Sequence, residues 1–128
     1  MKTPRKAARP RSPRLNTTLT TVIAAALDKK AVDLVVLDLR SASAFTDFFV
    51  IATGLNVKQA QAIADAVEDS LAKKGAKPAL TEGYSRGEWI LLDYFDFIVH
   101  VFTPATRTFY DLERLWGDAK RIEVPAIG

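Results

Sequence analysis

The chain has 128 residues, of which 48% are hydrophobic and 26% are charged, as expected for one soluble globular domain with a tail. It contains no cysteine, which excludes disulfides, thiolate nucleophiles and cysteine-ligated zinc sites. No apolar run approaches the ~20 residues that a membrane-spanning helix needs, so we expect no membrane partner.

Positive charge is concentrated at the N-terminus. Residues 1–14 carry six basic residues and no acid, and the rest of the chain carries 12 basic and 15 acidic residues, so the net charge of +3 divides into +6 and 12 − 15 = −3. Three prolines and the lack of an apolar face predict a disordered basic tail. A solvated extension and a contact with RNA phosphates both stay open for this tail. A transit peptide is less favoured, because the stretch is short and broken by proline.

The first half of the chain predicts two helices and two strands. Apolar residues at helical spacing predict an amphipathic helix over residues 15–29. Runs rich in β-branched and large apolar residues predict strands over residues 32–39 and 48–54. Asn56 and Gln59 have the spacing of a reciprocal capping box, which predicts the start of the second helix.

The second half predicts three strands and one helix. The strands are expected over residues 79–82, 88–93 and 97–102, and Thr103 followed by proline predicts a helix that continues to Gly117. This order of elements indicates a single α/β domain with a mixed sheet of about five strands flanked by helices. We expect that domain to span residues 15–123, with a C-terminal extension over residues 124–128.

The hairpin of residues 88–102 sorts its side chains onto two unlike faces. If Tyr94 and Phe95 are the turn residues, Asp93 pairs with Asp96, and strand alternation then places the side chains. One face is wholly apolar and is predicted to be core: Ile90, Leu92, Phe97, Val99 and Val101. The other face mixes large apolar and ionisable groups, as an interaction surface does: Trp89, Leu91, Asp93, Asp96, Ile98, His100 and Phe102.

This second face supplies the predicted contact residues. The leading candidates for binding a partner are Trp89, Leu91, Asp93, His100 and Phe102, followed by Tyr84, Arg86 and Tyr110. On the last helix, Phe109, Leu112 and Trp116 share one side and are predicted to be core, whereas Tyr110 turns away from it. Exposed aromatic residues also predict self-association, as a homodimer, when no larger partner is present.

Asp93, Asp96 and His100 could instead form an acid–base or metal cluster, because two-metal phosphoryl transfer needs converging carboxylates. However, aspartates beside a turn are favoured for their backbone hydrogen bonds, and the sequence offers no nucleophile paired with a base and an orienting group. We therefore expect no catalytic residue, metal or cofactor. A metal-dependent, nucleotidyltransferase-like enzyme that uses these three residues is the alternative.

Three ordered blocks of sequence resemble the ribosomal silencing factor (RsfS, or Iojap-like) family. The blocks are DFFVIATGLNVKQAQAIAD, EGYSRGEWILLDYFDFIVHVF and RTFYDLERLWGDA, and the likeness covers roughly residues 15–123. It implies an α/β domain with a nucleotidyltransferase-like topology but without the catalytic carboxylates of that fold. Residues 37–39 and 52–54 indeed lack the spaced acidic pair that such enzymes use for magnesium.

The resemblance implies a cytoplasmic translational repressor rather than an enzyme. Such a factor binds the large ribosomal subunit through ribosomal protein L-fourteen and blocks joining of the small subunit when nutrients are scarce. Three residues depart from the family pattern. Phe48 stands where the family usually has tyrosine, Phe95 stands where a glycine often turns the hairpin, and Asn56 replaces a usual serine. The basic tail lies outside the shared region, and a contact of this tail with ribosomal RNA stays open.

Overall fold

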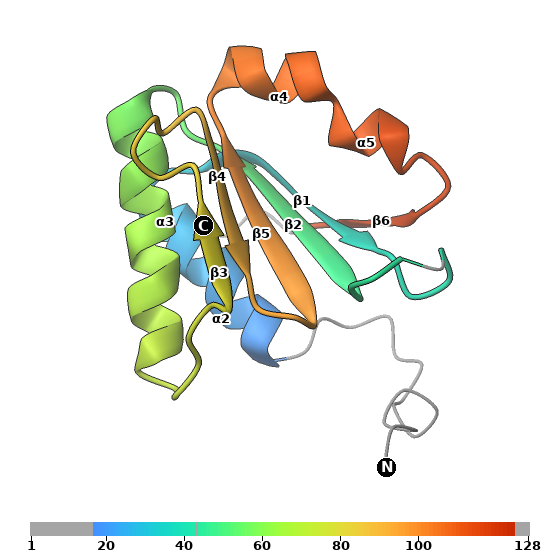
Figure 1. Cartoon of the computed structure of the whole chain (residues 1–128), viewed down its shortest axis with the longest axis horizontal. Helices are drawn as coiled ribbons and strands as arrows, with labels where there is room; N and C mark the ends of the chain where they lie inside the picture. Colours follow the sequence, from blue (N-terminus) through green and yellow to red (C-terminus); the bar gives the residue numbers. More distant parts are fainter. Residues whose placement is uncertain (1–16, 43, 125–128) are drawn as a thin grey trace.

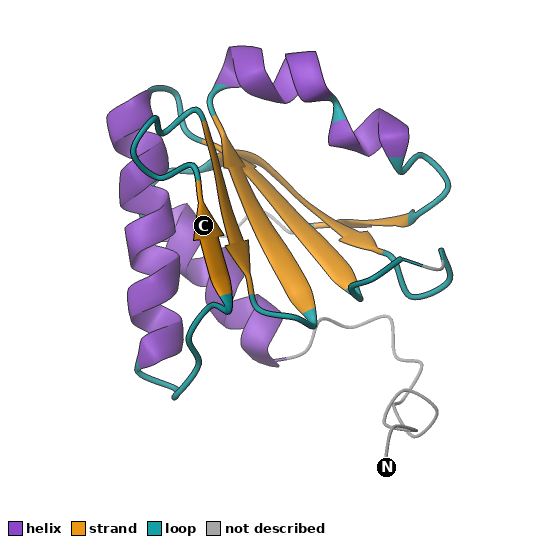
Figure 2. Cartoon of the chain, viewed as in Figure 1, coloured by secondary structure: helices purple, strands orange, loops and turns teal. Residues whose placement is uncertain are grey.

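The computed structural model describes residues 17–42 and 44–124 of the chain. The basic tail predicted over residues 1–14 lies outside the described residues, as does all of the predicted C-terminal extension except Val124. The described residues form one α/β domain, in which helices lie on both sides of a single sheet (Figure 2).

Six strands form this mixed sheet, in the order β3-β4-β5-β2-β1-β6 (Figure 1). Every neighbouring pair is antiparallel except β2 with β5, which run parallel. The strands are β1 (Val32–Asp38), β2 (Phe48–Thr53), β3 (Leu80–Glu82), β4 (Trp89–Asp93), β5 (Phe97–Phe102) and β6 (Lys120–Glu123). The predicted strands are therefore confirmed, and β6 is an additional strand.

Helices α2 (Thr17–Asp28) and α3 (Val57–Ala72) cover one face of the sheet and close the larger core. The wholly apolar side of the hairpin packs into this core, as predicted. Two short helices, α4 (Pro104–Tyr110) and α5 (Leu112–Leu115), follow β5 at the other side of the sheet. A second core forms there, in which Leu112 and Trp116 pack against buried residues of β1, β2 and β5.

The predicted cap of α3 is present, with one difference. Oδ1 of Asn56 accepts a hydrogen bond from the backbone N–H of Gln59 at 2.8 Å. The side chain of Gln59 accepts from the N–H of Leu55 at 2.9 Å, one residue before the expected partner. Its amide nitrogen also donates to the carbonyls of Lys29 and Lys30, which ties the end of α2 to the start of α3.

The hairpin pairs two residues out of the predicted register. Leu91 lies opposite His100 and Asp93 lies opposite Ile98, so the predicted pairing of Asp93 with Asp96 is wrong. The turn residues are Phe95 and Asp96, because the N–H of Tyr94 donates to the carbonyl of Phe97 at 2.9 Å. A shift of two residues leaves each side chain on its predicted face, since the strand period is two.

The C-terminal part of the chain differs most from expectation. The single predicted helix over residues 104–117 is broken at Asp111, whose φ of 49° lies in the left-handed region. Residues 120–123 then pair antiparallel with β1 instead of trailing off, so the sheet has six strands rather than about five. Only Ile122 among these four residues is apolar, so the sequence there carries no strand-like alternation.

Replacing Asn56 with alanine should lower the free energy of unfolding by about 1 kcal/mol, because the N–H of Gln59 loses its acceptor. Asn56→Ser should stay within a few tenths of a kcal/mol of the parent, because serine also caps helices well. Urea unfolding followed by circular dichroism measures both changes. Equal stability of the alanine and serine variants would show that the cap contributes nothing.

Candidate partner-binding surface

An aromatic surface lies where α4 and the loop before β4 meet the end of the sheet, and we define it by Tyr84, Arg86, Trp89, Phe109 and Tyr110. Phe109 is 79% exposed and Tyr110 is 48% exposed, although both are large hydrophobic side chains. A shallow cleft of about 340 Å³ runs through this surface and is lined by Gly83, Arg86, Glu88, Trp89, Thr106 and Tyr110. Exposed aromatic residues around a cleft are typical of a protein-binding site.

Ring contacts connect this surface to the core. The ring of Phe109 meets Tyr110 edge-on at 4.9 Å, Tyr110 lies 4.5 Å from Trp89, and Trp89 stacks on buried Phe102 at 5.1 Å. Each such pair adds stabilisation beyond the area that it buries. The exposed rings are therefore held in place by the packed rings beneath them, and a partner would meet a preorganised surface.

His100 supports Trp89 from below. Nε1–H of Trp89 donates to Nδ1 of His100 at 3.0 Å, so the proton of the neutral imidazole is on Nε2. His100 is only 3% exposed, and burial lowers its pKa to about 4. Among the described residues, Nε2 has no hydrogen-bond partner. The imidazole is thus neutral at physiological pH and acts as a fixed acceptor for the indole.

The prediction that His100 and Phe102 are exposed contact residues is wrong. Both side chains are buried, as is Ile98. Helix α5 and the turn after it fold back over this face, and Trp116 packs edge-on against Phe49, the neighbour of His100. The sorting of the hairpin faces was correct, but this tertiary contact turned most of the second face into core.

The other predicted contact residues are spread along the hairpin. Trp89 and Leu91 are half-buried and pack at the edge of the second core. Asp93 lies at the far end of β4 from Trp89, where its Oδ1 accepts the N–H of Phe95 at 2.8 Å. Asp93 therefore belongs to the turn and not to the aromatic surface.

The loop that carries Tyr84 and Arg86 is held against α3. The hydroxyl of Tyr84 donates to the carboxylate of Asp65 at 3.0 Å, and this bond raises the pKa of the phenol. The amide of Gln61 donates to the carbonyl of Tyr84 at 2.8 Å. Gly83, at φ 78°, passes so close to the Trp89 carbonyl that a Cβ would lie 2.0 Å from its oxygen. The loop thus reaches Trp89 only because residue 83 is glycine.

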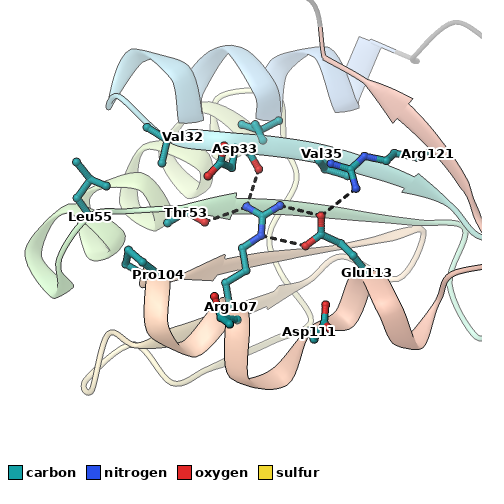
Figure 3. Close-up of a pocket in the computed structure, with 12 residues that line it drawn as sticks. Val32, Asp33, Val35, Thr53, Leu55, Pro104, Arg107, Asp111, Glu113 and Arg121 are labelled. Atoms are coloured by element: carbon teal, nitrogen blue, oxygen red, sulfur yellow. Dashed lines mark hydrogen bonds and ion pairs between the residues drawn. The ribbon is translucent and has the colours of Figure 1, made fainter.

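Arg107 fixes α4 to the sheet (Figure 3). Its Nε and Nη2 donate to the two carboxylate oxygens of Glu113, both at 3.1 Å, which lowers the pKa of that carboxyl group. Its Nη1 donates to the hydroxyl of Thr53 at 2.9 Å and to the carbonyl of Asp33. These four hydrogen bonds, which we call the Arg107 clamp, span the break at Asp111. Arg107 also lines a polar cleft of about 670 Å³.

Sequence reasoning missed Arg107 and placed Phe109 in the core. The partners of Arg107 come from β1, β2 and α5, so no local spacing marks them. Phe109 was assigned to a continuous helix, and the break at Asp111 turns it outward. Aspartate enters the left-handed region more readily than most residues, which was the one available signal.

Asp93, Asp96 and His100 do not assemble as a reaction centre. Within residues 17–42 and 44–124, no group of three histidine or acidic side chains could hold a metal ion. His100 is buried, hydrogen-bonded to Trp89 and neutral, whereas Asp93 precedes the turn and Asp96 lies in it, at the other end of β4. The carboxylates of Asp93 and Asp96 therefore do not converge with the imidazole of His100.

Acid should destabilise the protein through His100. As the pH falls from 6.5 to about 4, the unfolded chain binds a proton that the folded chain excludes, so unfolding should become easier by about 3 kcal/mol. His100→Asn keeps an acceptor for Trp89 but cannot titrate, so this part of the pH dependence should vanish. Urea unfolding between pH 7 and pH 4 compares the two proteins, and parallel profiles would contradict the assignment.

Arg107→Lys should lower the free energy of unfolding by about 1–2 kcal/mol, because an ammonium cannot satisfy Glu113, Thr53 and Asp33 together. The matched control is Arg114→Lys on the exposed side of α5, which should change stability little. Thermal unfolding of both variants measures the difference, and equal melting temperatures would show that the clamp is dispensable.

Comparison with known proteins places the chain in a family. The family model described as "Ribosomal silencing factor during starvation" matches residues 12–128. A ribosomal silencing factor RsfS from Halalkalibacterium halodurans is 40% identical over 100 residues, covering 78% of this chain and 86% of that protein. The RsfS of Bacillus subtilis is 42% identical over 96 residues, covering 75% of this chain and 81% of that protein.

The fold agrees with a solved structure. A crystal structure of a protein from Chromobacterium violaceum superimposes with a TM-score of 0.76 at 34% sequence identity, covering 87% of this chain and 91% of that one. The family match extends over nearly the whole sequence, and it includes every element that builds the aromatic surface. The chain therefore belongs to the ribosomal silencing factor (RsfS) family.

Proposed function

We propose that this protein silences translation by docking on the large ribosomal subunit through the aromatic surface. The contact partner is ribosomal protein L-fourteen, and the bound factor occupies space that the small subunit needs in order to join. The observation that carries the proposal is the exposure of Phe109 and Tyr110 on a rigid stack above Trp89. The description of the family as acting during starvation supports the same biological role.

The energetics are adequate for a steric inhibitor. A large aromatic side chain buries ~150–250 Å² at an interface, and at ~25 cal/mol/Å² this contributes up to ~4–6 kcal/mol before ordering costs. Phe109 is already held by Tyr110, so it loses little conformational freedom on binding. One or two such anchors can dominate an interface.

Tyr84 and Arg86 form the polar rim of the proposed interface. Arg86 and Glu88 make an exposed ion pair at 3.2 Å, which contributes little to stability and can be exchanged for contacts with a partner. Tyr84 lies in the same loop as Arg86, and its phenol is held by Asp65 of α3. Specificity would come from this rim, and affinity from Trp89 and the two rings above it.

No chemical step is needed for this function. The family is described as a silencing factor, and we propose that this protein is likewise a regulator rather than an enzyme. In the described ranges, no helix has the length and apolar character that crossing a membrane requires. We propose action in the cytoplasm, with the aromatic surface also available for a homodimer in the absence of ribosomes.

Phe109→Ala and Tyr110→Ala should each weaken binding to purified large subunits by at least about tenfold, because each removes an interface anchor. Neither side chain is buried in the core, so folding should be unaffected. The matched control is Leu115→Ala, which removes an apolar side chain on α5 about as exposed as Phe109 and should bind normally. Sedimentation of the variants with large subunits measures the affinities.

A subunit-joining assay completes this test. Variants that lose large-subunit binding should also stop inhibiting association with small subunits, in proportion to the loss. Normal co-sedimentation of both aromatic variants, or a loss for Leu115→Ala as large as theirs, would contradict docking through the aromatic surface.

A further inference from the structure

A second pair of exposed aromatic side chains lies at the other end of the hairpin. Phe95 is 74% exposed at the β4–β5 turn, and Phe45 is 76% exposed in the loop before β2. Trp89 begins β4, and Phe95 lies two residues after its last residue, Asp93. Roughly 13 Å of strand therefore separates this end from the aromatic surface. The proposed docking surface therefore does not account for these two phenyl rings.

Hydrogen bonds hold the two loops together. The hydroxyl of buried Thr46 donates to the carbonyl of Phe95 at 2.7 Å, and the N–H of Asp47 donates to the carbonyl of Asp96 at 3.0 Å. The N–H of Phe95 donates to Oδ1 of Asp93. Both phenyl groups thus project from a fixed backbone.

Phe95 adopts an unfavourable backbone conformation. Its φ of 72° lies in the left-handed region, which bulky side chains rarely occupy and which glycine adopts freely. Strained residues of this kind cluster at binding sites, where the surrounding contacts maintain them. An exposed phenylalanine in a backbone conformation suited to glycine indicates that its ring takes part in binding.

Lysine residues flank the turn on its other side. Helix α3 ends at the same end of the sheet as the β4–β5 turn (Figure 1). In the segment that leads from α3 to β3, Lys73, Lys74 and Lys77 are all exposed. The N–H of Ala79 donates to the carbonyl of Asp93 at 2.7 Å, which ties this segment to the hairpin. The lysine-bearing segment, the β4–β5 turn and the Phe45 loop therefore lie in a row across one end of the sheet.

We propose that this end of the molecule, formed by Lys73, Lys74, Lys77, Phe95 and Phe45, is a binding edge for single-stranded RNA. Exposed aromatic rings stack on unpaired bases, and neighbouring cations contact the phosphates. Asp93 precedes the turn and Asp96 lies in it, so the phosphates run along the lysine side while the bases face the phenyl rings. The proposal does not depend on docking to L-fourteen, because the two surfaces lie at opposite ends of β4.

Fluorescence anisotropy of the full chain with a labelled oligouridine of about 12 nucleotides tests the stacking. Phe95→Gly should weaken binding by at least about fivefold without changing its salt dependence, because stacking releases no counterions. The variant should unfold at a temperature no lower than the parent, since glycine relieves the backbone strain. A loss of affinity therefore cannot be attributed to misfolding.

Replacing Lys73, Lys74 and Lys77 together with glutamine tests the phosphate contacts. The slope of log K against log salt should decrease by about 2, at about 0.7 for each lysine. The matched control replaces Lys29 and Lys30, which are exposed at the opposite end of the domain beside the start of α3. This control should leave the slope unchanged.

Two results would overturn the RNA-binding edge. One is an unchanged affinity of Phe95→Gly for the oligouridine, including the case in which that variant binds large subunits poorly and the ring contacts protein instead. The other is an equal decrease of the salt slope per lysine when Lys29 and Lys30 are replaced. That result would mean that any surface cation attracts the RNA to the same extent. Tyr110→Ala should keep normal affinity for free RNA, so a failure here is separable from a failure of the docking proposal.

Discussion

The clamp made by Arg107 is the interaction on which the position of the aromatic surface depends. One guanidinium joins Glu113 to Thr53 and to the Asp33 carbonyl, and so holds the C-terminal part of the chain against the ends of β1 and β2. The polypeptide bends at Asp111 within this clamp. Because of that bend, α4 presents its aromatic side chains outward while α5 covers the sheet.

The same closure explains the state of His100. Once α5 and Trp116 cover the second face, an imidazole there must be neutral, because desolvation disfavours its charged form. A neutral imidazole accepts one hydrogen bond, and Trp89 donates it. The buried imidazole of His100 thus orients the indole of Trp89. The indole in turn supports the exposed rings of α4.

The two ends of the hairpin have different chemistry, and each is suited to a different partner. At one end, aromatic rings rest on a packed core, with a weak ion pair at the rim, as in protein interfaces. At the other end, the phenyl groups of Phe45 and Phe95 lie beside exposed lysines, as in proteins that bind single-stranded nucleic acids. The rigid sheet between them would let a single small domain engage both protein and RNA.

Local patterns in the sequence determined the elements with strong periodicity, since strands β1 to β5, helix α3 with its Asn56 cap, and the two faces of the hairpin were all predicted correctly. The ordered sequence blocks also determined the family. Only the tertiary structure decided that His100 is buried, that Phe109 is exposed and that residues 120–123 form a strand. These features depend on contacts between residues far apart in the chain, such as Arg107 with Asp33, which no local spacing encodes.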